Sequence, residues 1–198
     1  MPIKGEGWEI LVERLGLHVF GVRKRTYATY RVFIDGKPDD ALSGHICECV
    51  GPGDLVKESG KRILQGRYPL ARQFGKKYKT AGFNPDEKAD GVFPMPGILL
   101  GRTKPRDGII IHPGHSPKLY LSSIGCLNPT RPLGPKDVMV FAESRARVIA
   151  LIESLRTFAP QAFKATSGTS IPNAWAVIDG EPMNVLPAAP PKPSSLVS

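Results

Sequence analysis

Short runs of β-branched, aromatic and other apolar residues recur along most of the chain, separated by turns that contain Gly, Pro, Asn or Asp. Runs of this length and composition are typical of β-strands rather than helices. The turn chemistry of Asp35-Gly36 predicts a hairpin between the second run and the third. The pattern predicts strands at residues 8–14, 26–34, 44–50, 61–70, 97–102, 108–112, 137–141 and 174–178.

Only one stretch, residues 143–158, shows a strong helical period, and Pro160 is expected to end it. Its apolar residues fall at i, i+3, i+4 and i+7, which predicts a helix with one buried stripe. We therefore expect a mainly β fold, β-rich α+β, in which this main helix packs on a compact mixed or antiparallel sheet. The stripe consists of Val148, Leu151, Ile152 and Leu155.

The chain is expected to form a single domain over residues 1–182, followed by a Pro-rich flexible tail at residues 183–198. Residues 72–95 are polar and rich in turn formers, so we interpret them as a lid-like excursion. No window of the sequence approaches the 18 apolar residues of a membrane span. The first ten residues lack a basic segment followed by an apolar one, so we expect synthesis in the cytoplasm without a signal peptide.

Composition adds a charge argument. The chain of 198 residues carries 27 Lys and Arg against 18 Asp and Glu, a formal net charge of +9. A surface of this kind attracts polyanions such as nucleic acid, anionic lipid or an anionic cell wall. A basic surface also serves solubility alone, so charge by itself does not select a partner.

The cysteine count is three, an odd number that rules out a complete disulfide framework. His45, Cys47 and Cys49 alternate and would share one face of a strand, where His18 could join them as a fourth zinc ligand. The spacing is unlike that of a zinc knuckle, so we favour a packed strand face and predict neither a metal nor a cofactor.

The chemistry of the chain is concentrated between Ile111 and Pro129. His112 follows an apolar run, and Cys126 stands fourteen residues later, directly after Gly125. A thiol reacts as its thiolate, and a nearby imidazole is the usual base that forms one. A glycine before the nucleophile lets the backbone bend so that amides can face a developing oxyanion. A buried, inert cysteine is the plainer alternative.

This segment resembles the active-site signature of the L,D-transpeptidases, bacterial enzymes that remodel peptidoglycan through a catalytic cysteine. The matching residues are Ser123, Gly125, Cys126, Leu127 and Asn128, with His112 as the upstream histidine. The strand start at residues 63–68 is similar to the family's as well, and small phage-associated and effector-type relatives share the Ile-His-x-Gly and Gly-Cys core. The spacer is slightly short, and Ile124 replaces the family's histidine before Gly-Cys.

The resemblance implies a fold of the L,D-transpeptidase type and thiol chemistry on peptidoglycan stem peptides. Cys126 would be the nucleophile and His112 its base, with Gly125 at the oxyanion and Ser123 orienting the base or the substrate. The outcome would be crosslinking, trimming as a carboxypeptidase, or exchange of a D-amino acid. The expected substrate-binding residues are Asn128, Arg131, His115 and Tyr120, and His115 could replace the missing histidine.

If that activity holds, a chain without a signal peptide implies non-classical delivery to the periplasm or cell wall. The protein would then be an antibacterial effector, a toxin or a phage protein, with secretion machinery and an immunity protein as partners.

Two rival functions belong to other classes. Cell-wall amidases of the cysteine peptidase type place the cysteine before the histidine, the reverse of the order here. A non-enzymatic module that binds cell wall or nucleic acid would explain the charge without a nucleophile; we do not expect nucleic acid as a partner of the enzyme.

Overall fold

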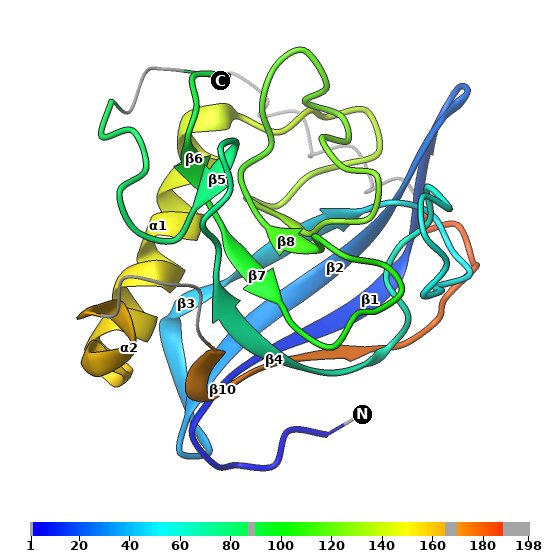
Figure 1. Cartoon of the computed structure of the whole chain (residues 1–198). Helices are drawn as coiled ribbons and strands as arrows, with labels where there is room; N and C mark the ends of the chain where they lie inside the picture. Colours follow the sequence, from blue (N-terminus) through cyan, green and yellow to red (C-terminus); the bar gives the residue numbers. More distant parts are fainter. Residues whose placement is uncertain (1, 87–89, 165–169, 188–198) are drawn as a thin grey trace, which may run out of the picture.

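The computed structural model describes residues 2–86, 90–164 and 170–187 (Figure 1). Within these residues the chain is mainly β, with one large mixed sheet and one main helix packed on it, as the sequence predicts. The strands are β1 Trp8–Phe20, β2 Arg23–Ile34, β3 Lys37–Glu48, β4 Gly66–Arg72, β5 Tyr78–Lys79, β6 Met95–Pro96, β7 Ile98–Leu100, β8 Ile110–Ile111, β9 Asn128–Thr130 and β10 Ser170–Asp179. The helices are α1 Phe141–Phe158 and α2 Pro160–Lys164.

The large sheet has the strand order β8-β7-β4-β10-β1-β2-β3-β9. Strands β1, β2 and β3 form an antiparallel meander, and β10 returns parallel to β1, with Ile10 opposite Ala176. The remaining neighbours in the sheet pair antiparallel. Strands β5 and β6 form a separate parallel pair inside the excursion of residues 72–95.

The two edges of the large sheet meet at one point. Ile111 at the end of β8 forms a parallel bridge with Leu127, the residue before β9. The His112 N–H donates to the Leu127 carbonyl at 3.0 Å, and the Leu127 N–H donates to the Ile110 carbonyl at 3.0 Å. The sheet therefore closes on itself, and the closing seam is formed by residues beside His112 and Cys126.

The core lies on the concave side of this closed sheet. Alternate residues of the strands, such as Ile10, Tyr30 and Ile46, join the bridge residues in one buried cluster. Helix α1 adds its predicted stripe, whose four side chains are fully buried. Alternation of side chains then leaves Leu11 and Glu13 of β1 and the odd-numbered residues of β2 on the opposite face, and the bulge between Arg14 and Gly16 reverses the alternation in the rest of β1.

Several local predictions were wrong. Residues 137–140 form no strand; Val140 has an extended backbone that caps the start of α1 at Phe141. Pro160 does follow the end of α1, but it also begins the short helix α2. Strands β5, β6 and β9 have only two or three residues each, too few to show a period of two in the sequence.

The segment after β10 is attached to the sheet. The Leu17 N–H donates to the Asn184 carbonyl, and the Leu186 N–H donates to the Leu17 carbonyl, both at 2.9 Å. The flexible tail predicted for residues 183–198 is therefore held by β1 over its first residues, whereas its residues 188–198 lie outside the described part of the chain.

None of the described helices combines the length and the apolar character that crossing a membrane requires.

We predict that Leu151→Ala lowers the free energy of unfolding by about 2–5 kcal/mol, because it leaves a cavity beneath α1. Glu153→Ala on the same helix, where the side chain is half exposed, should change it by less than about 0.5 kcal/mol. Urea denaturation of both variants measures the difference. Equal losses would show that α1 does not contribute its stripe to the core.

Candidate active site

Cys126 lies on a tight turn that three local contacts shape. The Ser123 hydroxyl donates to the Cys126 carbonyl at 2.7 Å and accepts the Gly125 N–H at 2.8 Å. Gly125 has a φ of 141°, in the region that favours glycine. Ser123 therefore holds the turn of the cysteine and makes no recorded contact with His112.

The closing seam places Cys126 and His112 on one face. Because Ile111 and Leu127 pair with their side chains in the core, the flanking residues of both segments point the other way. Cys126 stands next to Ile110, and His112 is two residues further along, on the same outer face. The two residues therefore take diagonal positions on this face, with Cys126 level with Ile110 and Asn128 level with His112.

His112 is buried and held in one tautomer. Its Nδ1 lies 2.8 Å from the Pro113 carbonyl oxygen, which can only accept, so Nδ1 carries the proton. Nε2 is then the unprotonated nitrogen, the one that can accept a proton. Burial lowers the pKa of His112 to about 3, and the nearby His115 and Lys77 lower it as well, against the Pro113 hydrogen bond, which raises it. The imidazole is neutral throughout the physiological range.

Asn128 belongs to the support of His112 rather than to a substrate site. Its side chain is completely buried, and its Nδ2 donates to the His112 carbonyl at 3.0 Å. The side chain has no exposed surface through which it could pair with a substrate carboxylate, so the structure offers no support for the predicted binding role of Asn128. The side chain fixes the backbone of His112 from the neighbouring strand.

Tyr78 from the excursion of residues 72–95 covers the histidines. Its ring lies 4.4 Å from that of His112, and its hydroxyl is 3.1 Å from His115 Nε2. Burial raises the pKa of Tyr78, and the nearby Cys126 raises it further. His115 lies 6.1 Å from His112, ring to ring, so the site does contain a second imidazole. Tyr78 was not named among the predicted site residues, although it belongs to the excursion of residues 72–95 that the sequence analysis interprets as a lid.

Cys126 is half-buried, and its sulfur lies beside the residues that immediately precede β8. It lies 3.6 Å from the Gly108 carbonyl oxygen, and no recorded hydrogen bond joins it to His112 among the described residues. Burial raises the pKa of the Cys126 thiol, outweighing the Ile110 backbone hydrogen bond and the positive charges of Arg106 and Lys77, which lower it. The sequence led us to expect a raised thiolate fraction at neutral pH; the structure instead gives a protonated thiol at rest.

Arg106 braces the cysteine turn from behind. The side chain is buried, and its guanidinium donates to the Ile124 carbonyl at 2.8 Å and to the Lys61 carbonyl. It also pairs with Asp54 at 3.2 Å. A Cβ on Gly125 would overlap this guanidinium, so the contact requires a glycine at position 125. Arg106 thus ties the loop of residues 54–62 to the turn that carries Cys126.

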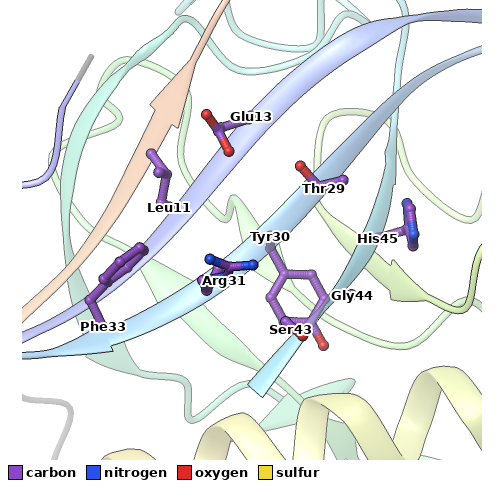
Figure 2. A pocket seen from close by; sticks show the side chains of 9 residues that line it. All are labelled: Leu11, Glu13, Thr29, Tyr30, Arg31, Phe33, Ser43, Gly44 and His45. Atoms are coloured by element: carbon purple, nitrogen blue, oxygen red, sulfur yellow. The ribbon is translucent and has the colours of Figure 1, made fainter. Parts of the chain in front are cut away.

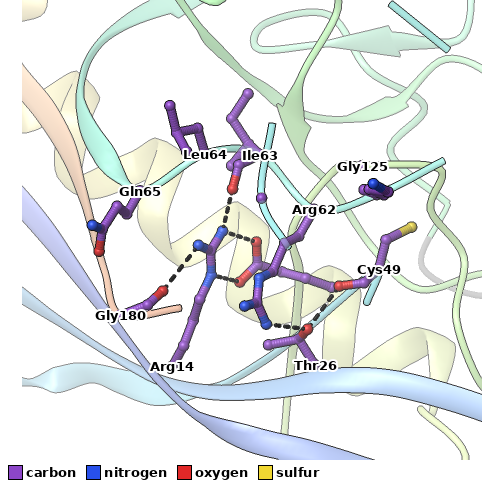
Figure 3. A network of polar contacts seen from close by, with 12 residues as sticks. Arg14, Thr26, Cys49, Arg62, Ile63, Leu64, Gln65, Gly125 and Gly180 are labelled. Atoms are coloured by element: carbon purple, nitrogen blue, oxygen red, sulfur yellow. Dashed lines mark hydrogen bonds and ion pairs between the residues drawn. The ribbon is translucent and has the colours of Figure 1, made fainter. Parts of the chain in front are cut away.

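A second layer of buried arginines continues this brace (Figure 3). Arg14 pairs with Glu48 at 2.8 Å, and Arg62 donates to the Thr26 hydroxyl at 2.9 Å. That hydroxyl in turn donates to the Cys49 carbonyl at 2.7 Å. The Cys49 thiol then donates to the Ser123 carbonyl at 3.2 Å, and Figure 3 shows its sulfur directed toward Gly125.

Two shallow clefts flank the cysteine turn, one on each side of Ile124, which is 72% exposed. One cleft of about 260 Å³ is lined by Arg106, Ile109 and Cys126 among others. The other, of about 280 Å³, is lined by Lys77, His115 and Ser123 among others. The side chain that replaces the family's histidine therefore forms a ridge between two openings, one of which reaches the sulfur.

Two predicted substrate residues lie away from these clefts. Arg131 forms an ion pair with Glu143 at 3.1 Å, at the start of α1. Tyr120 is buried against Arg25, whose guanidinium carbon lies 4.3 Å from the ring centre. Neither residue lines the openings beside Ile124, so the geometry gives neither of them a place in substrate binding.

The residues of the zinc alternative are engaged elsewhere. The ring of Tyr27 stacks between those of His18, at 4.1 Å, and His45, at 5.0 Å. Cys47 is buried in an apolar cluster, where desolvation raises the pKa of its thiol to about 11. Among residues 2–86, 90–164 and 170–187, no three His, Cys, Asp or Glu side chains gather as a metal site.

A further concavity of about 360 Å³ lies on the β1–β3 region of the sheet (Figure 2). Glu13, Arg31 and Phe33 stand on its β1 and β2 side, and His45 on its β3 side. It contains neither Cys126 nor His112. The chemistry indicated by the sequence is therefore confined to the seam.

We predict that iodoacetamide modifies Cys126 before Cys47 or Cys49, which are buried. Because burial raises the pKa of the Cys126 thiol, its modification rate should keep rising with pH and reach no plateau below pH 9.0, the ordinary pKa of a cysteine. Peptide mass spectrometry over a pH series measures the rate at each site. A plateau near neutral pH would show a preformed thiolate instead.

We predict that Gly125→Ala destabilises the protein and displaces the cysteine turn, because the new Cβ meets Arg106 and the φ is unfavourable. Gly60→Ala is the matched control: its φ is also positive, at 68°, but its Cβ would meet open space. Thermal unfolding should show a loss at least about 1 kcal/mol larger for Gly125→Ala. Equal losses of stability in the two variants would mean that the Arg106 side chain moves away from the new Cβ at no cost in free energy.

No protein-family model, curated protein or solved structure matches this chain. The resemblance to the L,D-transpeptidases therefore depends on the sequence around His112 and Cys126 alone.

Proposed function

We propose that the protein is a cysteine-dependent acyltransferase of the L,D-transpeptidase type that acts on peptidoglycan stem peptides. The observation that carries the proposal is the seam: Cys126 and His112 share its outer face, and the Pro113 carbonyl fixes the His112 tautomer with Nε2 unprotonated. A nucleophile, a base and a group that orients the base are the minimum set for this chemistry.

Proton transfer begins from a neutral pair. Because the thiol is protonated and the imidazole is neutral at rest, His112 acts as a general base that removes the proton as the sulfur attacks. The sulfur rotates about the Cα–Cβ bond of Cys126, away from the Gly108 carbonyl and toward Nε2. The imidazolium formed then returns its proton to the amine of the leaving D-alanine.

The attacked carbonyl belongs to the diaminopimelate residue of a stem tetrapeptide, and it becomes an oxyanion before D-alanine leaves. The Gly125 N–H already donates to the Ser123 hydroxyl, so the oxyanion role expected for Gly125 passes to the Cys126 N–H. A well-aimed backbone donor contributes roughly 3 kcal/mol to such a step. The thioacyl enzyme is then released by an amine of a second stem, by water, or by a free D-amino acid.

The ridge at Ile124 separates the two clefts and gives the two halves of the reaction different openings. The cleft that contains Cys126 receives the acyl donor, and the cleft with Lys77 and His115 receives the group that resolves the thioester. His115, held by Tyr78, takes the place near the nucleophile that a histidine at position 124 has in the family. Delivery to the cell wall as an effector remains a prediction of the sequence.

The proposal predicts release of D-alanine from disaccharide-tetrapeptide, together with a covalent adduct on Cys126 detected by mass spectrometry. Cys126→Ala should abolish both, and His112→Ala should lower the rate by more than about a thousandfold. Cys47→Ala is the matched control, since Cys47 is buried in a separate apolar cluster. Unchanged turnover in Cys126→Ala, or no product from any tetrapeptide between pH 6 and 10, would reject the proposal.

A further inference from the structure

We propose that the tip of the β1–β2 hairpin binds the surface of membranes that contain anionic lipid, with Phe20 and Val22 entering the interface. This inference does not depend on the acyltransferase proposal, because it involves a different part of the molecule. Its basis is a group of exposed apolar side chains that lie outside the buried core.

The hairpin ends in a two-residue turn. Phe20 pairs with Arg23, and Gly21 and Val22 form the turn, with Gly21 at a φ of 58°. Turns of this kind usually contain Asn, Asp or Gly, and Gly21 fills one of the two positions. The other position is Val22, whose side chain is 97% exposed, beside Phe20 at 45%. Figure 1 shows the hairpin, in blue, projecting beyond the rest of the sheet.

Apolar surface continues from the tip along one side of the hairpin. A groove of about 530 Å³ is lined by Phe20, Pro135, Val185 and Leu186 among others. Val185 is 59% exposed, although its backbone is bridged to Leu17 of β1. The exposed side chains of Phe20, Val22 and Val185 thus come from two segments and lie on one end of the molecule, which is the arrangement expected of a binding surface.

Positive charge surrounds this apolar surface. Arg23 and Lys24 are exposed at the tip, Lys118 lines a groove with both of them, and Lys136 lines the groove of Phe20. In the part of the chain that the structure describes, none of these four cations forms an ion pair. The neighbouring acid, Asp137, accepts a hydrogen bond from the Gly134 N–H.

An anionic bilayer matches both parts of the surface. Exposed lysine and arginine near a membrane are attracted by acidic headgroups, and apolar side chains at a projecting tip enter the boundary between headgroups and acyl chains. Nucleic acid would pair with the cations but would leave Val22 in water. Val22 is the most exposed large apolar side chain of the described chain, which favours an occupant with an apolar phase.

Vesicle sedimentation tests the proposal with the full chain. In 100 mM salt, the protein should bind vesicles of phosphatidylcholine and phosphatidylglycerol and should bind pure phosphatidylcholine much more weakly. Val22→Asp should weaken binding to the mixed vesicles by roughly tenfold or more, because it removes the apolar contact and adds repulsion. Circular dichroism verifies that the variant folds.

Val56→Asp is the matched control, because Val56 is 61% exposed in a different loop and the substitution changes the net charge equally. It should retain nearly all of the binding. Val22→Trp adds a direct readout: the fluorescence that the new indole adds to that of the parent chain should shift to the blue and be quenched by lipids brominated on the acyl chains. Three outcomes would overturn the proposal: no vesicle binding, equal losses in the two Asp variants, or an added indole emission that vesicles leave unchanged. A hairpin that serves a protein or nucleic-acid partner would give one of these outcomes.

Discussion

The pairing of Leu127 with Ile111 is the constraint on which the rest of the site depends. It joins the two edges of the sheet and buries both side chains in the core. The pleat then leaves Cys126 and His112 no choice but the outer face. The same apolar contacts that stabilise the fold therefore set the register between Cys126 and His112, and a one-residue slip of either segment would turn its side chain into the core.

The buried arginines that support the cysteine turn are charged, whereas Cys126 and His112 on the outer face of the seam are neutral. Behind the cysteine turn, Arg106 and Arg62 are buried and satisfied by carbonyls and by the acids Asp54 and Glu181. Removing one partner of such a pair leaves a buried charge uncompensated, which makes the brace costly to disturb. On the outer face of the seam, the Cys126 thiol and the His112 imidazole are both neutral, so this pair adds no charge to a desolvated region.

The sequence predicted those parts of the fold whose signal is local. The β-rich runs within β1–β3 and the helical stripe of α1 each depend on consecutive residues, and both were recognised, although residues 15–20 of β1 and 37–43 of β3 were missed. The strand predicted at residues 137–141 was wrong because its apolar residues, Met139 and Phe141, serve two buried clusters that only the tertiary structure brings together. Strands β5, β6 and β9 are defined by their partners and have no pattern of their own.

The site shows the same division. The motif singled out Cys126 and His112, whose segments meet at the seam because they form a strand, a loop and a return to the sheet. It did not reveal the burial of Asn128, because residue type does not report burial: this amide donates to the backbone of His112. Tyr78 and Arg106 were not singled out, because each reaches the site from a segment outside the motif.

The basic residues of the chain fall into two groups: buried arginines that are paired with acids, and exposed cations, some of which form no ion pair in the described structure. Glu48, Asp54 and Glu181 are paired with buried arginines, which occupy acids that could otherwise neutralise the surface. The surplus of positive charge therefore lies on exposed side chains such as Lys24 and Lys136, which form no ion pair in the described structure. The brace that orders the cysteine turn thus also determines where the protein is free to attract an anionic surface, and at the projecting hairpin that charge adjoins an exposed apolar tip.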